Sequence, residues 1–322
     1  MFQFRLFSLF IVAAIAAAGW ALTCGAWRLE REVDRVGPLE SRDFAQLTVI
    51  TVGTGAAREN PDRRGPATAI GMGARVVLVD AGRAVADALR LALIPVVQPD
   101  TVYLTSLLSE NTVGLDDLLM VGWTEGRGAP LRVVGPTGTK ALTEALTAAH
   151  RRGVEARTGG LGIQSEAPYF EVVEIGGGWS EQIGELVVRA AALPGGPIDA
   201  LAYRFDGRDR SAVISGTGWA PAELIEFTRG ANLLTHEAVY IPTPELAEQM
   251  GLEADPEQLR REAAEHTAID AVGALARETG VETLVLVRLR PPPVYDLQIT
   301  SVVDDEFGGR IVIASDGDEI TP

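Results

Sequence analysis

The residues of this chain that could carry acid–base chemistry centre on a small number of histidines. Three are present, His150, His236 and His266, and the second stands directly before an acidic residue, Glu237. An imidazole beside a carboxylate can transfer protons near neutral pH, because the carboxylate fixes the imidazole tautomer. The single cysteine, Cys24, excludes an intrachain disulfide. His236, Glu237 and His266 are therefore the candidates for proton transfer.

Charge and length limit the classes of function. The net charge is −16 across 322 residues, and the arginines are scattered. A nucleic-acid-binding protein needs a basic face to neutralise phosphates, so the composition argues against one. The length suits one α/β domain of about 280 residues with a full hydrophobic core.

The N-terminus predicts export. Residues 6–27 contain no charged side chain, and about 20 apolar residues suffice to span a bilayer as a helix. We expect a transmembrane anchor or signal segment at residues 1–27, then a polar linker at residues 28–46. A signal peptide cleaved near Ala16-Ala17-Ala18 and a lipoprotein acylated at Cys24 remain open as alternatives. All three alternatives export the domain formed by residues 47–322.

That domain alternates short apolar runs with helical segments. We expect helices at Ala84–Leu93, from Gly135-Pro136 to about His150, at Pro221–Thr228 and at Pro256–Thr279. Strands are expected at Leu47–Gly55, Ala67–Ile70, Arg75–Val79, Val102–Leu104, Leu131–Val134, Phe170–Ile175, Leu186–Ala191, Leu201–Phe205, Ala212–Ser215 and Thr283–Val287, with two more between Leu297 and Ile313. This order predicts two sheets packed face to face with helices outside.

Short motifs along these elements resemble the ribonuclease Z/arylsulfatase-like branch of the metallo-β-lactamase superfamily. They are Val52-Gly53-Thr54-Gly55, Arg64-Gly65-Pro66, Val79-Asp80-Ala81-Gly82, Gly114-Leu115, Gly122-Trp123, Gly126-Arg127, Pro130-Leu131, Gly135-Pro136, Tyr203-Arg204, Ser215-Gly216, His236-Glu237-Ala238 and His266-Thr267. The resemblance covers the chain from Leu47 to the C-terminus. It implies an α/β fold, the αββα four-layer sandwich with two mixed sheets.

The resemblance also implies two metal ions, usually zinc, that activate a bridging water. The seven positions that match the family's ligands are Ser106, Leu108, Glu110, Asn111, Gly195, Thr217 and Arg288. A leucine side chain has no lone pair, and an arginine brings a permanent positive charge to a cation site. Three histidines in the whole chain cannot supply the five that the family uses. We therefore expect no cofactor here, although active relatives hold zinc.

The positions of Glu237 and His266 match a proton-transfer pair in these enzymes. Without an activated water, we favour a packing role in which the pair joins two loops. A relocated single-metal site built from Asp80, Glu110, Glu237 and His266 is an alternative. A serine-hydrolase mechanism at Ser106 or Thr217 lacks a matching histidine nearby.

The resulting expectation is an exported pseudo-hydrolase, tethered to the membrane by a single N-terminal helix with its domain on the periplasmic or extracytoplasmic side. It would act as a binding or scaffold protein rather than as an enzyme. Expected partners are the membrane, a membrane protein or a second copy of the chain, and a small anion attracted by Arg288. The alternative is an active hydrolase of phosphodiesters, sulfate esters or lactones that uses a relocated metal.

Overall fold

The computed structural model divides the chain into two compact units, Met1–Glu40 and Ser41–Pro322. The described residues are 19–20, 22–29, 31, 37–58, 60–160, 168–196, 198–216, 218–219, 221–249, 251, 255–291 and 296–322. In the first unit residues 22–29 are helical, and Trp20 and Trp27 are exposed. Among the described residues, no helix is long and apolar enough to cross a membrane; most of the predicted anchor, residues 6–18 and Ala21, lies outside them.

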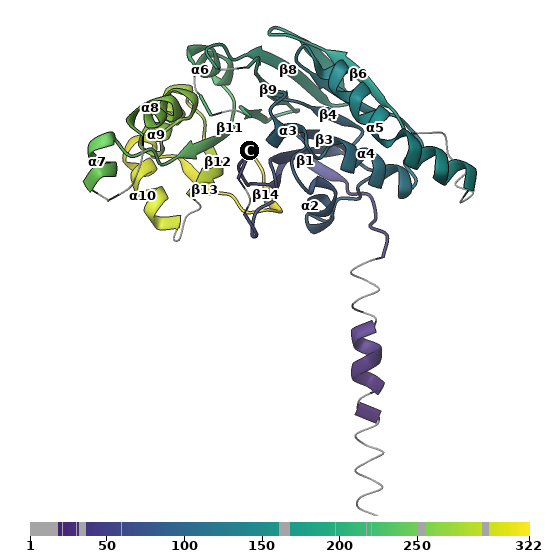
Figure 1. Cartoon of the computed structure of the whole chain (residues 1–322). Helices are drawn as coiled ribbons and strands as arrows, with labels where there is room; N and C mark the ends of the chain where they lie inside the picture. Colours follow the sequence, from purple (N-terminus) through teal and green to yellow (C-terminus); the bar gives the residue numbers. More distant parts are fainter. Residues whose placement is uncertain are drawn as a thin grey trace, which may run out of the picture. The chain divides into compact units, whose positions relative to one another are not determined.

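The second unit is built on two seven-stranded sheets (Figure 1). The first has the order β14-β1-β2-β3-β4-β5-β6, formed by β1 (Phe44–Gly53), β2 (Ala67–Gly73), β3 (Arg75–Val79), β4 (Thr101–Tyr103), β5 (Leu131–Gly135), β6 (Phe170–Glu174) and β14 (Asp318–Ile320). The second has the order β13-β12-β11-β10-β9-β8-β7, formed by β7 (Ser180–Ile183), β8 (Leu186–Ala192), β9 (Leu201–Asp206), β10 (Ser211–Ile214), β11 (Leu233–Val239), β12 (Thr283–Arg290) and β13 (Arg310–Ile313). Both sheets are mixed, with β3 to β6 parallel in the first and β10 to β13 parallel in the second.

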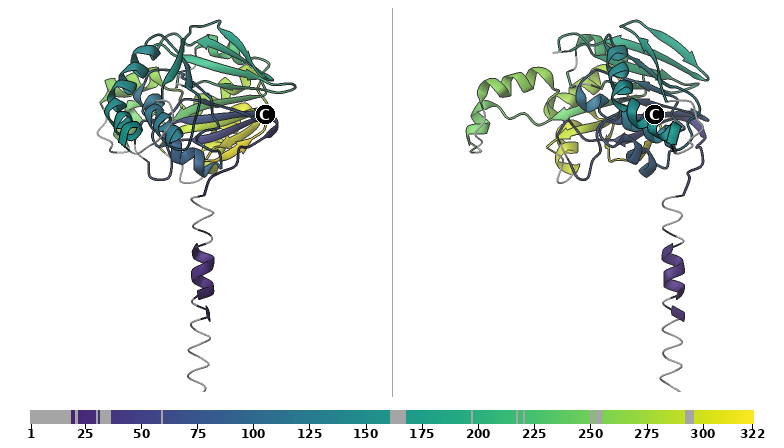
Figure 2. Two further views of the ribbon diagram at one scale, coloured as in Figure 1. Left: turned by 90° about the vertical axis from the view of Figure 1, so that its right-hand side faces the viewer. Right: turned by 45° about the vertical axis from the view of Figure 1, so that its right-hand side comes forward.

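Three apolar cores separate four layers. Figure 2 shows the sheets and the helices outside them in two further views. The central core lies between the sheets and contains Tyr103, Tyr203 and Phe205. Each of the two outer cores lies between the outer face of one sheet and the helices that cover that face. The helices are α2 (Val85–Leu91), α3 (Ser109–Thr112), α4 (Leu115–Thr124), α5 (Thr139–Gly160), α6 (Ala222–Thr228), α7 (Pro244–Gln249), α8 (Pro256–Glu265), α9 (Ile269–Thr279) and α10 (Asp296–Phe307). The predicted αββα sandwich is confirmed.

One predicted helix is broken in the structure. Residues 256–279 were expected to form a single helix, but α8 ends at Glu265 and α9 begins at Ile269. His266 between them has an extended backbone, and the carbonyl oxygen of Thr267 accepts a hydrogen bond from the N–H of Val239. Pairing with β11 therefore overrides a helical pattern that is continuous in the sequence.

Two further expectations about elements were wrong in part. Two strands were expected between Leu297 and Ile313; one is present as β13, but the preceding residues form α10, because Ile299 and Val303 are buried at helical spacing against the outer core. The helix after β5 was expected to end near His150 but runs to Gly160. His150 therefore lies within α5, where its Nε2 is 2.7 Å from Asp116 Oδ2 of α4.

Candidate functional site

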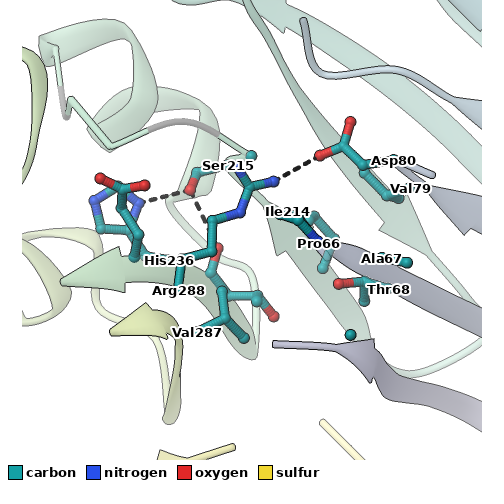
Figure 3. A pocket seen from close by; sticks show the side chains of 14 residues that line it. Pro66, Ala67, Thr68, Val79, Asp80, Ile214, Ser215, His236, Val287 and Arg288 are labelled. Carbon is teal, nitrogen blue, oxygen red and sulfur yellow. Dashed lines mark hydrogen bonds and ion pairs between the residues drawn. The ribbon is translucent and has the colours of Figure 1, made fainter. Parts of the chain in front are cut away.

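The site is centred on a buried ion pair between the two sheets. Asp80 follows β3 of the first sheet, and Arg288 lies near the end of β12 in the second. Arg288 Nη2 donates a hydrogen bond to Asp80 Oδ2 at 2.8 Å, and the two side chains are 9% and 2% exposed (Figure 3). Both residues have left-handed backbones, with φ values of 62° and 53° for Asp80 and Arg288. Such strained conformations are typical of positions that the surrounding fold holds for a specific purpose.

Thr105 completes the environment of the Asp80 carboxylate. Its backbone N–H donates to Asp80 Oδ1 at 2.8 Å, and its hydroxyl lies 2.8 Å and 2.9 Å from the two carboxylate oxygens. Asn111 Nδ2 in turn donates to Thr105 Oγ1 at 3.0 Å and to Ser106 Oγ at 2.8 Å. The loop after β4 is therefore fastened to Asp80 through hydrogen bonds between side chains.

A second chain of hydrogen bonds runs through His236 on β11. His236 Nδ1 lies 2.6 Å from Ser215 Oγ, and His236 Nε2 lies 2.8 Å from Thr267 Oγ1. Thr267 Oγ1 also donates to the carbonyl oxygen of Gly218. Because the Thr267 proton goes to that carbonyl, the arrangement is satisfied when Nε2 carries the His236 proton and Ser215 donates to Nδ1. His236 thus joins strand β11 to the loop after β10 and to the connection between α8 and α9 while remaining neutral.

Burial sets the protonation of the two central groups. Burial lowers the pKa of His236 to about 4, which the charge of Glu237 partly opposes. Burial raises the pKa of Asp80 to about 6, against the charge of Arg288 and the hydrogen bonds from Thr105. Above pH 7 the site therefore contains a neutral imidazole and an ionised Asp80 paired with Arg288.

Glu237 and His266 lie together at the edge of this cluster. His266 Nδ1 is hydrogen-bonded to Glu237 Oε1, and the side chains are 27% and 8% exposed respectively. Gly218 packs directly on the pair, since a Cβ atom there would lie 1.7 Å from Glu237 Oε1 and 2.7 Å from His266 Nδ1. The two residues are adjacent as the motif implied, but a backbone segment covers them closely.

Little space remains inside the cluster. The cavity beside Arg288 has a volume of about 10 Å³, comparable with one water molecule. Thr105 fills the space next to Gly216, where a Cβ atom would lie 2.2 Å from Thr105 Cβ. A substrate cannot reach Asp80 or Ser215 without movement of these loops.

The other predicted ligand positions do not gather into a donor set. Leu108 and Glu110 are half-buried, and Leu108 precedes the first turn of α3. Gly195 borders a separate cavity of about 370 Å³ together with Pro194 and Asp199. Thr217 lies outside the described residues. The four residues proposed for a relocated metal site do not share one centre either. Asp80 is hydrogen-bonded to Arg288, whereas Glu237 is hydrogen-bonded to His266.

Sequence reasoning missed the parts played by Ser215, Thr267 and Thr105. Ser215 and Thr267 stand in the quoted motifs, but their bonds to His236 join residues 21 and 31 positions apart in the chain. The partner of Arg288 is 208 positions away. Only the resemblance, which placed Asp80 and Arg288 in the same region, carried a signal for this contact.

The fold and the site define a class. The chain has two face-to-face mixed sheets with helices outside. A polar cluster lies at the ends of β3, β4, β10, β11 and β12. This is the architecture of metallo-β-lactamase fold proteins. Solved structures agree: the metallo-β-lactamase fold protein YhfI from Bacillus subtilis superposes with a TM-score of 0.65 at 18% identity, covering 85% of this chain and 98% of that one. The short form of human tRNase Z gives a TM-score of 0.62 at 18% identity, covering 85% and 98%.

Sequence relatives identify the family. The chain is 30% identical over 250 residues to ribonuclease Z of Mycobacterium sp. (strain KMS), covering 76% of this chain and 85% of the relative. Ribonuclease Z of Mycobacterium marinum is 27% identical over 277 residues, covering 84% and 96%. No family model matches the chain. The chain belongs to the ribonuclease Z family of the metallo-β-lactamase superfamily.

The zinc ions that this family implies do not fit the residues present. Zinc takes about four nitrogen, sulfur or oxygen donors. Arg288 instead brings a permanent cation, and Asn111 offers a single buried oxygen, Oδ1, that has no hydrogen-bond partner among the described residues. In the described part of the chain, no three His, Cys, Asp or Glu side chains come together in a way that could hold a metal.

Proposed function

We propose that this chain is a member of the ribonuclease Z family that does not hydrolyse the family's substrates and acts instead as a binding or scaffold protein. The observation that carries the proposal is the Arg288–Asp80 pair, buried at a position that matches a metal ligand. Arg288 supplies internally the positive charge that a metal would supply in an active relative. The pair therefore satisfies Asp80 without leaving a coordination position open.

The remaining acid–base residues support the same conclusion. A positioned general base contributes about 10²–10⁴-fold to a rate, far less than the full acceleration of phosphodiester hydrolysis. His236 is fully buried and its ring nitrogens are bonded to Ser215 and Thr267. His266 is bonded to Glu237, beneath Gly218. Both imidazoles hold loops together.

We also propose export and tethering through the N-terminal segment, with the domain on the extracytoplasmic side. Support comes from the 22 uncharged residues at positions 6–27 and from Trp20 and Trp27, which are both exposed. Fractionation of cells that express the full chain, with intact-mass measurement of the recovered protein, tests this part. Recovery of the uncleaved protein in the cytoplasmic fraction would refute it.

We favour a macromolecule or a second copy of the chain as the binding partner over a small anion in the former cleft. The space beside Arg288 is about 10 Å³, so a phosphate or carboxylate ligand would require the loops around Gly218 to open.

The test of lost hydrolysis combines metal content with turnover. The full chain is purified and its zinc, manganese and iron are measured, and hydrolysis of bis(p-nitrophenyl) phosphate and of a tRNA precursor is followed with each metal added. A mycobacterial ribonuclease Z relative, prepared identically, is the positive control. We expect substoichiometric metal and no turnover above background in a folded protein. Stoichiometric metal with chelator-sensitive turnover would overturn the proposal and favour the relocated-metal hydrolase.

A further inference from the structure

A small cavity lies between the two sheets beside Arg288 (Figure 3). Its lining comes from β1, β2 and β3 of the first sheet and from β10, β11 and β12 of the second, together with residues that follow them. The polar residues that line it are Thr68, Asp80, Ser215, Thr235, His236, Glu237 and Arg288. At about 10 Å³ the cavity matches the volume that one water molecule needs.

Thr235 gives this cavity a specific polar partner. Thr235 lines the cavity and is 1% exposed, and strand alternation puts its side chain on the face of β11 that carries Leu233 of the central core. Thr235 Oγ1 nevertheless has no hydrogen-bond partner among the described residues. Buried hydroxyls are nearly always hydrogen-bonded, because removing one from water without a partner costs free energy. A ligand in the cavity would satisfy the hydroxyl.

We propose that the cavity binds one structural water molecule, held by Thr235 Oγ1 from the second sheet and by polar groups around the Arg288–Asp80 pair. A cation is disfavoured because the Arg288 guanidinium is permanently charged and lies in the lining. An anion is disfavoured because the lining contains the carboxylates of Asp80 and Glu237. Water is neutral, both donates and accepts, and has the right size.

The bound water extends the contact between the sheets. Asp80 and Thr68 belong to the first sheet's side of the cavity, and Thr235 and Arg288 to the second. The Arg288–Asp80 hydrogen bond already joins these sides. The water adds a bridge next to it and makes Thr235 part of the same polar cluster. This inference does not depend on whether the protein hydrolyses anything.

The first test compares two buried threonines that look alike. Thr228, at the end of α6, is 0% exposed, and its Oγ1 also has no partner among the described residues, but it does not line the cavity. Thr235→Val should raise the unfolding equilibrium constant about tenfold, because the water loses a partner. Thr228→Val should leave that constant unchanged or lower it, and Thr235→Ser should retain most of the wild-type value. Urea unfolding of the full chain provides the measurement.

The second test is a crystal structure of the wild-type chain at high resolution, which applies even if a variant fails to fold. We expect one density peak within hydrogen-bonding distance of Thr235 Oγ1 and without anomalous signal. An empty cavity, or a peak with metal-like anomalous signal and coordination distances, would overturn the proposal. So would a Thr235→Val variant as stable as the wild type.

Discussion

Two acid–base pairs lie at neighbouring positions of the site and differ in how they are held. Asp80 and Arg288 form the first pair, and their side chains are 2% and 9% exposed. Glu237 and His266 form the second pair, and the imidazole is 27% exposed. The first pair joins the two sheets through one hydrogen bond and Thr105 adds further bonds to Asp80, whereas the second pair joins one strand to one loop.

The contrast shows how burial and bonding partners decide the state of an acid–base group. Gly218 packs closely on Glu237 and His266 and leaves little room for a different arrangement of that pair. The buried Asp80 carboxylate is instead kept ionised at neutral pH by the guanidinium of Arg288 and by the hydrogen bonds from Thr105.

Removing the cation of the buried pair should have the largest effect on stability. Arg288→Met leaves the Asp80 carboxylate buried without its charged partner, and breaking such a pair costs about 3–5 kcal/mol. Urea unfolding at pH 7 measures the loss. The double variant Asp80→Asn/Arg288→Met removes both charges and should be more stable than Arg288→Met alone. If Arg288→Met loses less free energy of unfolding than the double variant does, the two residues are not energetically coupled.

Thr105→Val tests the hydrogen bonds that surround the pair. The change keeps the shape of the side chain but removes the hydroxyl that donates to Asp80 and accepts from Asn111. We expect a loss of about 2 kcal/mol, since an unsatisfied partner of a charged group remains. The matched control is Thr139→Val, a fully buried threonine at the start of α5 whose hydroxyl bonds only to a backbone carbonyl. An equal loss of stability in both variants would show that the hydrogen bonds from Thr105 to Asp80 contribute no more than an ordinary buried hydroxyl bond.

The sequence predicted the fold better than it predicted the site. Apolar runs such as those of β1, β5 and β9 are buried on both faces, so composition alone located them. The break at His266 could not be seen in the same way, because its cause is pairing with β11 rather than a local breaker. The resemblance indicated that Arg288 would bring a charge to the site, but not that Asp80 would neutralise it. Contacts between residues 208 positions apart depend on how the sheets pack, which local patterns do not record.

The pH dependence of stability distinguishes the two buried titrating groups. As the pH falls from 7 to 5, the unfolded chain binds a proton at His236 that the folded chain, with a pKa of about 4, does not bind, so stability falls. Over the same window the folded chain protonates Asp80, whose pKa is about 6, before the unfolded chain does, so stability rises. The two contributions, each about 1–2 kcal/mol, oppose one another, and the wild type should change little.

His236→Gln should expose the contribution of Asp80. Without the imidazole, the free energy of unfolding is expected to rise by about 1 kcal/mol between pH 7 and pH 5, whereas that of the wild type should change little. Urea midpoints at pH 7, 6 and 5 for both proteins provide the comparison. Parallel curves for the two proteins would mean that His236 does not titrate as its burial requires.

The smallest effect is expected at the Glu237–His266 pair. Glu237→Gln keeps an acceptor for His266 Nδ1, and the imidazole is 27% exposed, so solvent can still reach the partner of the lost charge. We therefore expect a loss below about 1 kcal/mol. Asp80→Asn makes the same chemical change in the buried pair and should cost several times more, because Arg288 is left uncompensated. Unfolding of both variants in urea at pH 7 gives the ratio. Equal losses would show that the two pairs are equivalent structural contacts, and the contrast in burial between them would have no consequence for stability.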